Sequence, residues 1–304
     1  MAFVAGPGQM AANEALADLA TADSPRQDRR PVRSGHRLGR VVPNIVLVAA
    51  GIFFVAPLLS MARFALQNVP TFSLGWHTLF KRWSFSGITA SFHEPGFSDT
   101  LLLSVRLAIG TVLLTLLLLL PTALFVHIKL PKARGMVEFL TLLPYMVPPI
   151  ALVAGVIGFI RPHARWFLTS NYSLVPFYAI LALPFTYRSI DAGIRAIEVR
   201  TLIDASRSLG AGWITTFRRA LLPNLRSAVI SASFLTATVV LGEFTIAQVL
   251  FKKTFPTFLN NYGSHAAQGG MGLAILTLVA TTALLGLLTI LTRQKGTRQH
   301  AVRF

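Results

Sequence analysis

A short polar stretch between two apolar ones has the spacing of a contact surface rather than of a catalytic site. Asp204-Ala205-Ser206 is followed, after three intervening residues, by Gly210, and after nine more by Ala220-Leu221-Leu222-Pro223. Glycine suits the left-handed residue that ends a helix, and proline cannot continue one. The spacing therefore predicts two short helices joined at Gly210, with the Asp204 carboxylate free to meet a partner.

Both short helices are expected to be amphipathic. Their apolar residues lie near helical spacing: Leu202, Ile203, Ala205 and Leu209 in 201–209, and Ile214, Phe217 and Leu221 in a second helix beginning near Trp213. Pro223 is expected in a short break before the next apolar segment. Asp204 can pair with Arg207 or Arg200, for only tenths of a kcal/mol if exposed. The apolar stripe requires either a protein partner or a membrane surface to cover it.

Glu243 is a second candidate, because it lies inside an apolar run, Val239–Leu250. A carboxylate at membrane depth is costly and is by default a functional hypothesis, so Glu243 is a candidate for a translocation path. The structural alternative is a carboxylate held near the interface by a partner such as Arg106 or Lys252. The sequence alone weighs the two interpretations equally.

The sequence lacks the motifs of thiol, metal-binding, nucleotide-binding and nucleophilic sites. The sequence has no Cys, no H-E-x-x-H pair and no G-x-x-x-x-G-K-[ST] phosphate loop. We also find no paired nucleophile and base at membrane depth. We therefore expect no catalytic residue, no metal site and no cofactor bound by this chain. This argues against an intramembrane enzyme, the second rival interpretation, and excludes an ATPase of the phosphate-loop type.

Six apolar segments must position these residues. Hydrophobic residues make up 53% of the 304 residues and charged residues only 13%, against about 25% in soluble domains. The segments match the ~20 residues that span a bilayer, and cover roughly 42–66, 100–128, 136–160, 173–190, 227–251 and 271–292. The fourth is the weakest, being short and interrupted by Pro176 and Pro184. The fold class expected is all-α, a polytopic membrane protein with six transmembrane helices.

The basic residues indicate the orientation. With a cytoplasmic N-terminus, twenty of the 28 Lys and Arg fall in the tail, the 2–3 and 4–5 loops and the C-terminal tail. Both termini are therefore expected in the cytoplasm, and the net charge of +17 reflects topology rather than nucleic-acid binding. The expected divisions are a disordered basic tail (1–40), a transmembrane domain (41–295) containing the loop 193–226, and a C-tail (296–304). On the outer side, 67–99 is expected to be a long aromatic loop.

The acid–glycine–proline frame resembles the EAA loop of permeases from binding-protein-dependent ABC importers. That pattern is Glu-Ala-Ala, three residues, Gly, nine residues and Ile-x-Leu-Pro; here Asp204, Ser206 and Ala220 depart from it. The resemblance implies the type I importer permease fold and a coupling role for Asp204, Ala205, Ser206, Gly210, Leu222 and Pro223. It also implies a cytoplasmic ATPase dimer that binds ATP and Mg, an extracytoplasmic solute-binding protein, and a second permease, a different chain in preference to an identical one.

The resemblance extends to a substrate class. Leu-Gly-Glu-Phe at 241–244 and Pro144-Tyr-Met-Val-Pro148-Pro149 look like permeases for polyamines, phosphonates, ferric iron and thiamine, with the spermidine/putrescine type nearest. Such a chain would lie in the plasma membrane of a prokaryote, in contact with lipid, and would work by alternating access. A secondary transporter is the rival of another class, but would be expected to show more intramembrane acids or inverted repeats.

Overall fold

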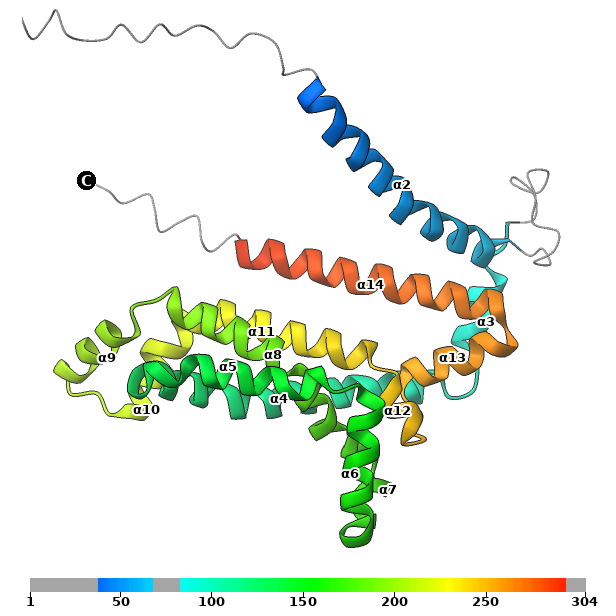
Figure 1. The fold of residues 1–304 in the computed structure, drawn as a ribbon. Coiled ribbons are helices and arrows are strands. Elements are labelled where there is room, and N and C mark those ends of the chain that lie inside the picture. Colours follow the sequence, from blue (N-terminus) through cyan, green and yellow to red (C-terminus); the bar gives the residue numbers. More distant parts are fainter. Residues whose placement is uncertain (1–37, 68–82, 294–304) are drawn as a thin grey trace, which may run out of the picture. The chain divides into compact units, whose positions relative to one another are not determined.

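The computed structural model describes residues 38–67 and 83–293, and in these ranges the chain is helical (Figure 1). The described residues contain one isolated antiparallel bridge, Gln67 to Trp83, and no strand. The all-α fold class is therefore confirmed. The chain divides into two units, Met1–Val55 and Ala56–Phe304, and each is described by itself.

The described part of the first unit is the beginning of α2 (Leu38–Leu66). Its stretch Pro43–Leu66 is long and apolar enough to cross a membrane. The side chains of residues 43–55 are all exposed, which an apolar helix tolerates only in lipid or against a partner. The predicted tail, apart from its last three residues, and the predicted C-tail lie outside the described residues.

The second unit contains the rest of the helices. They are α3 (Ser86–Phe92), α4 (Phe97–Lys129), α5 (Arg134–Met146), α6 (Pro149–His163), α7 (Arg165–Thr169), α8 (Leu174–Arg195), α9 (Val199–Ser208), α10 (Trp213–Thr216), α11 (Leu222–Gly242), α12 (Thr245–Val249), α13 (Phe255–His265) and α14 (Ala267–Arg293). In Figure 1, α4, α5, α8 and α11 lie side by side, with α9 and α10 at one end and α12 and α13 at the other.

Two of the predicted spans are shorter than expected because the backbone breaks. The third is bent by 91° between α5 and α6. Val147 there is extended, as the residue before a proline prefers, and Pro149 opens the next helix. The fifth span ends at Gly242, where Glu243 turns extended, and does not reach residue 251. By length and composition, three described helices, or four with the bent pair, could each cross a membrane.

The segment predicted to be weakest, α8, is the centre of the bundle. It packs against α4, α5 and α11, and buries Tyr178, Tyr187 and Ile190 almost completely. Pro184 lies inside the helix without ending it. Because α8 is surrounded by protein rather than lipid, it carries polar residues such as Thr186 and Asp191 in buried positions. These residues weaken its apolar signal in the sequence.

Small and polar side chains join α8 to α11. The hydroxyls of Thr186 and Thr236 are 2.7 Å apart and buried, and Ser189 Oγ donates to the Ala228 carbonyl at 3.2 Å. One turn further, Gly193 lies so close to Ala228 that a Cβ on the glycine would overlap the alanine Cβ. Small residues and interhelical hydrogen bonds of this kind hold helices together in lipid, where apolar burial alone gives no preference.

The end of the bundle opposite α9 is aromatic rather than a simple loop. The predicted loop 67–99 contains the helix α3, and α4 begins at Phe97, three residues earlier than expected. The Phe97 ring makes edge-to-face contacts with Phe92 and Phe255, with centroids 5.2 and 5.9 Å apart. Residues 68–82 of this loop lie outside the described part of the chain.

The contact between α8 and α11 leads to a first prediction. Gly193→Ala would force the two helices apart, and overpacking of this kind costs about 1–3 kcal/mol, or several degrees of melting temperature. Thermal unfolding in detergent, followed by tryptophan fluorescence, measures the loss. The double variant Gly193→Ala with Ala228→Gly should recover it, and Gly155→Ala, where the added Cβ meets open space, should not lower it. An unchanged melting temperature in the single variant would refute the contact.

Candidate functional site

The turn at Gly210 has the geometry that the sequence predicted. Gly210 has φ +76°, in the left-handed region, directly after α9 and Leu209. Its N–H donates to the Arg207 carbonyl at 2.9 Å, and the Ala211 N–H donates to the Ser206 carbonyl at 3.0 Å. These two bonds are the paired closure of a Schellman motif, so they satisfy carbonyls that the helix end would leave unpaired. The predicted helix stop at Gly210 is confirmed.

The predicted break at Pro223 is absent. Residues Trp213–Gly242 form one continuous helix, made of α10, a π-helical turn (Phe217–Leu221) and α11. A proline in a helix clashes with the carbonyl four residues before it, and a widened π turn makes room for that carbonyl. Pro223 therefore lies in the first turn of α11, and the second short helix runs directly into the span.

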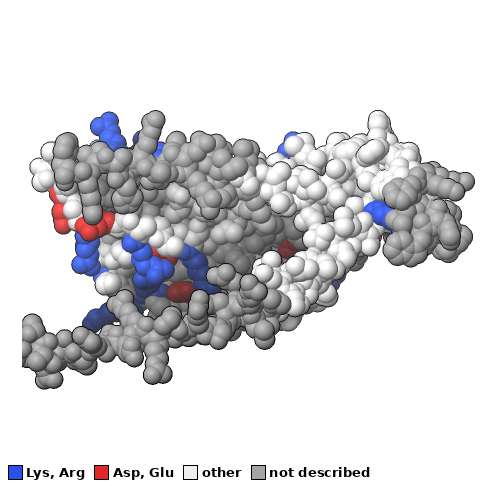
Figure 2. Space-filling view, turned by 90° about the horizontal axis from the view of Figure 1, so that it is seen from above, with Lys and Arg blue, Asp and Glu red and all other residues white. Residues whose placement is uncertain are grey.

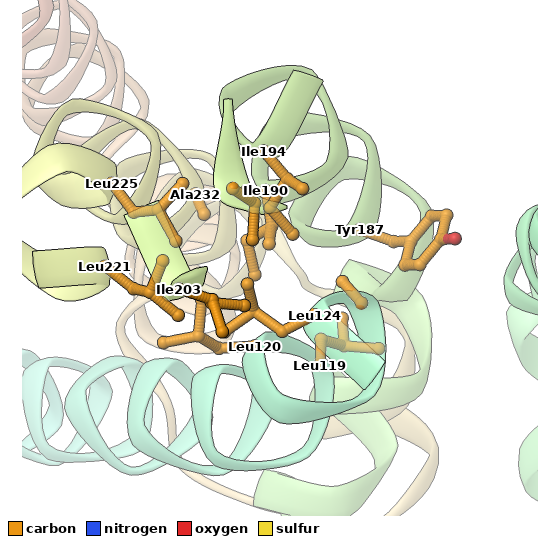
Figure 3. Packing of buried hydrophobic residues seen from close by; sticks show 12 residues of the cluster. Leu119, Leu120, Leu124, Tyr187, Ile190, Ile194, Ile203, Leu221, Leu225 and Ala232 are labelled. Atoms are coloured by element: carbon orange, nitrogen blue, oxygen red, sulfur yellow. The ribbon is translucent and has the colours of Figure 1, made fainter. Parts of the chain in front are cut away.

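An apolar cluster fixes the α9–α10 hairpin to α4, α8 and α11 (Figure 3). Ile203 and Val199 of α9 are 4% and 2% exposed. They belong to one cluster of buried residues contributed by α4, α8, α9, the π turn and α11: Leu119, Leu120, Ala123, Leu124, Tyr187, Ile190, Ile194, Val199, Ile203, Leu221, Leu225 and Ala232. The hairpin is consequently part of the packed body of the protein.

The expected apolar stripe divides into a buried part and an exposed part. Leu209 and Ile214, on either side of the Gly210 turn, are 87% and 72% exposed. We call these two residues with Gly210 the hairpin tip. The apolar residues farther from the turn, Ile203 and Leu221, are buried in the cluster instead. The tip is thus an uncovered apolar surface.

The predicted coupling residues fall into two groups. Asp204 and Ala205 are exposed on α9, while Ser206 is half-buried and its Oγ donates to the Leu202 carbonyl at 2.8 Å. Leu222 packs half-buried against the cluster, and Pro223 is exposed at the start of α11. Within the described ranges, Asp204 forms no ion pair with Arg200 or Arg207, contrary to the expected helix pairing. Lys and Arg side chains gather at the end that carries the hairpin (Figure 2).

Glu243 is 9% exposed, and its carboxylate accepts hydrogen bonds from the nearby backbone. Both carboxylate oxygens accept the backbone N–H of Ile246, at 2.9 and 3.1 Å, in the first turn of α12. The partners suggested by the sequence do not hold it: Lys252 Nζ donates to the Thr169 carbonyl at 2.7 Å, and Arg106 forms no ion pair among the described residues. The geometry favours a residue that positions α12 over one that faces a path.

Two arginines that the sequence analysis counted only for topology form an ion-pair group around a buried carboxylate. Asp191 Oδ2 lies 2.7 Å from Arg134 Nη2 and 2.8 Å from Arg195 Nη2, and the Asp191 side chain is 7% exposed. A second, more exposed pair joins Arg188 to Glu138 at 3.1 Å. The pairs Arg134–Asp191 and Arg188–Glu138 join α5 to α8, whereas Asp191–Arg195 lies within α8. Only the i,i+4 spacing of Asp191 and Arg195 could have been seen in the sequence.

The comparison with protein families decides what kind of molecule carries this hairpin. Residues 120–295, which include α5, α8, the hairpin, α11 and α14, match a family model described as the binding-protein-dependent transport system inner membrane component. The chain belongs to this family. It is therefore a multi-pass inner-membrane component of a binding-protein-dependent transport system, a permease.

Characterised relatives are more distant. The chain is 25% identical over 174 residues to the spermidine/putrescine transport system permease protein PotB of Escherichia coli strain K12, which is 52% of this chain and 62% of that protein. The PotB protein of Salmonella typhimurium strain SL1344 is equally similar, over 60% of its length. The matched stretch thus spans less than two thirds of either relative.

A solved structure has the same fold. A chain from the crystal structure of a bacterial ABC transporter involved in import of the acidic polysaccharide alginate superposes with a TM-score of 0.63. The superposition covers 85% of this chain and 98% of that one, at 13% sequence identity. The type I importer permease fold predicted from the sequence is confirmed by this likeness together with the family match.

The ion-pair group leads to a second prediction. Asp191→Asn removes the charge that two arginines share in a buried place, and should destabilise the protein by about 2 kcal/mol. Glu138→Gln removes the charge from the exposed pair and should cost under about 0.5 kcal/mol. Urea or thermal unfolding in the same detergent compares the two. Equal losses would contradict the importance of burial.

The hydrogen bonds from the Ile246 N–H to the Glu243 carboxylate lead to a third prediction, which separates the two interpretations of Glu243. Glu243→Gln keeps an oxygen that accepts the Ile246 N–H, so a positioning residue should tolerate the change. Glu243→Ala removes the acceptor and should cost about 1 kcal/mol of stability. Melting temperature and substrate uptake are measured on both. Uptake lost in Glu243→Gln, with a normal melting temperature, would instead assign the charge to the translocation path.

Proposed function

We propose that the α9–α10 hairpin docks on a separate cytoplasmic ATPase and transmits its movement to the membrane helices. The single observation that carries the proposal is the division of the hairpin between an uncovered tip and a buried base. Leu209 and Ile214 are exposed at the tip, whereas Ile203 and Val199 are packed among the spanning helices. A force on the tip therefore acts on α4, α8 and α11 directly.

The acid–glycine–proline frame supports the same role. Gly210 holds the tip in a defined turn, and the exposed Asp204 has no ion-pair partner in the described part of the chain. An amphipathic helix that only lies on a membrane has no need of a Schellman turn. The hydrolysis of ATP with Mg is assigned to the partner, because this sequence has no phosphate loop.

We propose a polyamine such as spermidine or putrescine as the solute. The support is the 25% identity to PotB proteins, whose names state that substrate. The likeness to the alginate importer concerns fold alone and carries no substrate. Phosphonate, ferric iron and thiamine are the competing solutes that an uptake experiment must include.

The remaining parts of the assembly follow from the same proposal. Both chain termini lie in the cytoplasm, since the basic residues are concentrated in the segments on that side. A second permease, a different chain in preference to an identical one, completes the path. An extracytoplasmic solute-binding protein delivers the solute, and alternating access is driven by the ATPase.

The fourth prediction concerns the Gly210 turn. Gly210→Ala places a side chain in a left-handed conformation that costs about 1–2 kcal/mol, so the turn should distort and ATP-driven uptake should fall severalfold. Gly210→Asn should lose less, because asparagine tolerates this conformation. Gly212→Ala is the matched control, since Gly212 has φ −72° and open space around it. Its uptake should equal the wild type.

The measurement is uptake of radiolabelled spermidine into proteoliposomes containing the copurified assembly and its binding protein. ATP hydrolysis is recorded in the same samples, so that lost coupling is distinguished from lost ATPase. Uptake without ATP that survives Gly210→Ala would overturn the coupling role and favour a secondary transporter. ATP-dependent uptake of phosphonate, iron or thiamine in place of spermidine would leave the coupling role intact and refute the substrate.

A further inference from the structure

A large cavity opens between the end of α4 and the hairpin. Its volume is about 710 Å³, and its walls come from the last turns of α4, from α9, and from the start of the helix that follows Gly210. The tip residues Leu209 and Ile214 do not line it. The hairpin tip therefore lies outside the cavity wall, whereas Asp204, one of the predicted coupling residues, lies on it.

Three cations surround this cavity. Lys129 comes from the last residue of α4, and Arg200 and Arg207 lie two turns apart on α9. All three are exposed, and no ion pair to a carboxylate is formed by any of them among the described residues. With Asp204 as the one acid on the wall, two positive charges remain in excess. The cavity is thus suited to an anionic group.

The interior of the cavity is apolar. Leu124 and Ile203 form buried parts of the wall, and Phe125 and Phe217 add aromatic surface. Phe125 is 57% exposed and continues a ridge of exposed apolar residues along α4, with Leu117 at 73% and Leu113 at 63%. The apolar floor is therefore continuous with the membrane-facing surface of a spanning helix, while the cations lie at its end.

The Trp213 side chain indicates that the cavity lies near the membrane–water interface. It lines the cavity from the first residue of α10 and is 51% exposed. Tryptophan is enriched where membrane meets water, because its ring is apolar and its N–H is polar. Cations, an apolar floor and an interfacial tryptophan match the three parts of a lipid: charged headgroup, acyl chain and the boundary between them.

We propose that this cavity binds an anionic phospholipid, with the headgroup phosphate between Lys129, Arg200 and Arg207 and an acyl chain along Phe125 and the α4 ridge. A soluble anion would use the cations but not the apolar floor. A protein docked on the hairpin would be expected to contact the exposed tip residues, and these do not line the cavity. Basic pockets between membrane helices are suited to such headgroups. The site lies at the base of the hairpin, so the lipid would contact α9 and α4 together.

Quenching of Trp213 by brominated lipid tests the site. The full chain is prepared with its other three tryptophans replaced by phenylalanine, in mixed micelles carrying either phosphatidylglycerol or phosphatidylcholine brominated on the acyl chain. Phosphatidylglycerol should quench Trp213 with about tenfold higher apparent affinity. The triple variant Lys129→Gln, Arg200→Gln, Arg207→Gln should lose that preference. Retention of phosphatidylglycerol by the unaltered chain after delipidation, against the same variant, gives a second measurement that does not depend on the tryptophan replacements.

The matched control changes three other arginines near the same end of the bundle. Arg218→Gln, Arg219→Gln and Arg226→Gln remove the same charge from exposed positions that do not line the cavity, so the lipid preference should survive. Equal quenching by both lipids in the wild-type cavity would overturn the proposal, as would loss of preference in the control alone. Displacement by excess inorganic phosphate at constant ionic strength would assign the cavity to a soluble anion. Complete protection by the copurified ATPase would assign it to the protein interface.

Discussion

The burial of Ile203 and Val199 against α4, α8 and α11 is the contact on which the rest of the structure depends. Within lipid, apolar side chains gain nothing by leaving the bilayer for a neighbouring helix, so α8 and α11 are joined by a threonine pair, a serine hydrogen bond and a glycine contact. The hairpin emerges beyond the ends of those helices, where water makes apolar burial worth about 1.5–3 kcal/mol for each large side chain. Interhelical hydrogen bonds and close contacts thus hold the helices together, and apolar burial from water holds the hairpin to them through the apolar cluster.

The sequence was most informative where a backbone conformation depends on one residue type. A left-handed residue after an amphipathic helix requires glycine, so the spacing of Asp204, Gly210 and Pro223 located the turn. The same logic failed at Pro223, because proline excludes a regular α-helix but not a widened π turn. The local sequence does not distinguish a helix break at Pro223 from a π turn before it, because the outcome depends on tertiary packing. The 91° bend at Val147 follows the preference of a residue before proline for an extended backbone. Packing against a neighbouring helix can override that preference, so the sequence alone did not predict the bend.

Helix α8 shows why hydropathy misjudges a central span. Hydropathy recognises a helix that contains a long apolar stretch, and α2, α4 and α11 each contain one. A helix enclosed by other helices instead gains from Thr186 and Asp191, whose partners on neighbouring helices lie 50 and 57 residues away in the sequence. Arg134 could be counted as a topology signal, but its 2.7 Å contact with Asp191 depends on the packing of α5 on α8. Glu243 was a candidate because a carboxylate inside an apolar segment is costly to bury. Its backbone partner, the Ile246 N–H, is within reach because the helix ends at Gly242, which the sequence did not predict.

The continuity of α10, the π turn and α11 makes the hairpin the short arm of a lever. The long arm is α11, whose 21 residues span about 32 Å at 1.5 Å per residue. A rigid tilt of about 5° at the hairpin would therefore carry Gly242 sideways by about 3 Å at that rise. The backbone breaks directly beyond this point, at Glu243, and α12 is tethered there by hydrogen bonds rather than by a continuous helix. The far end of the lever thus meets a joint, which allows α11 to swing while the helices after it keep their own orientation.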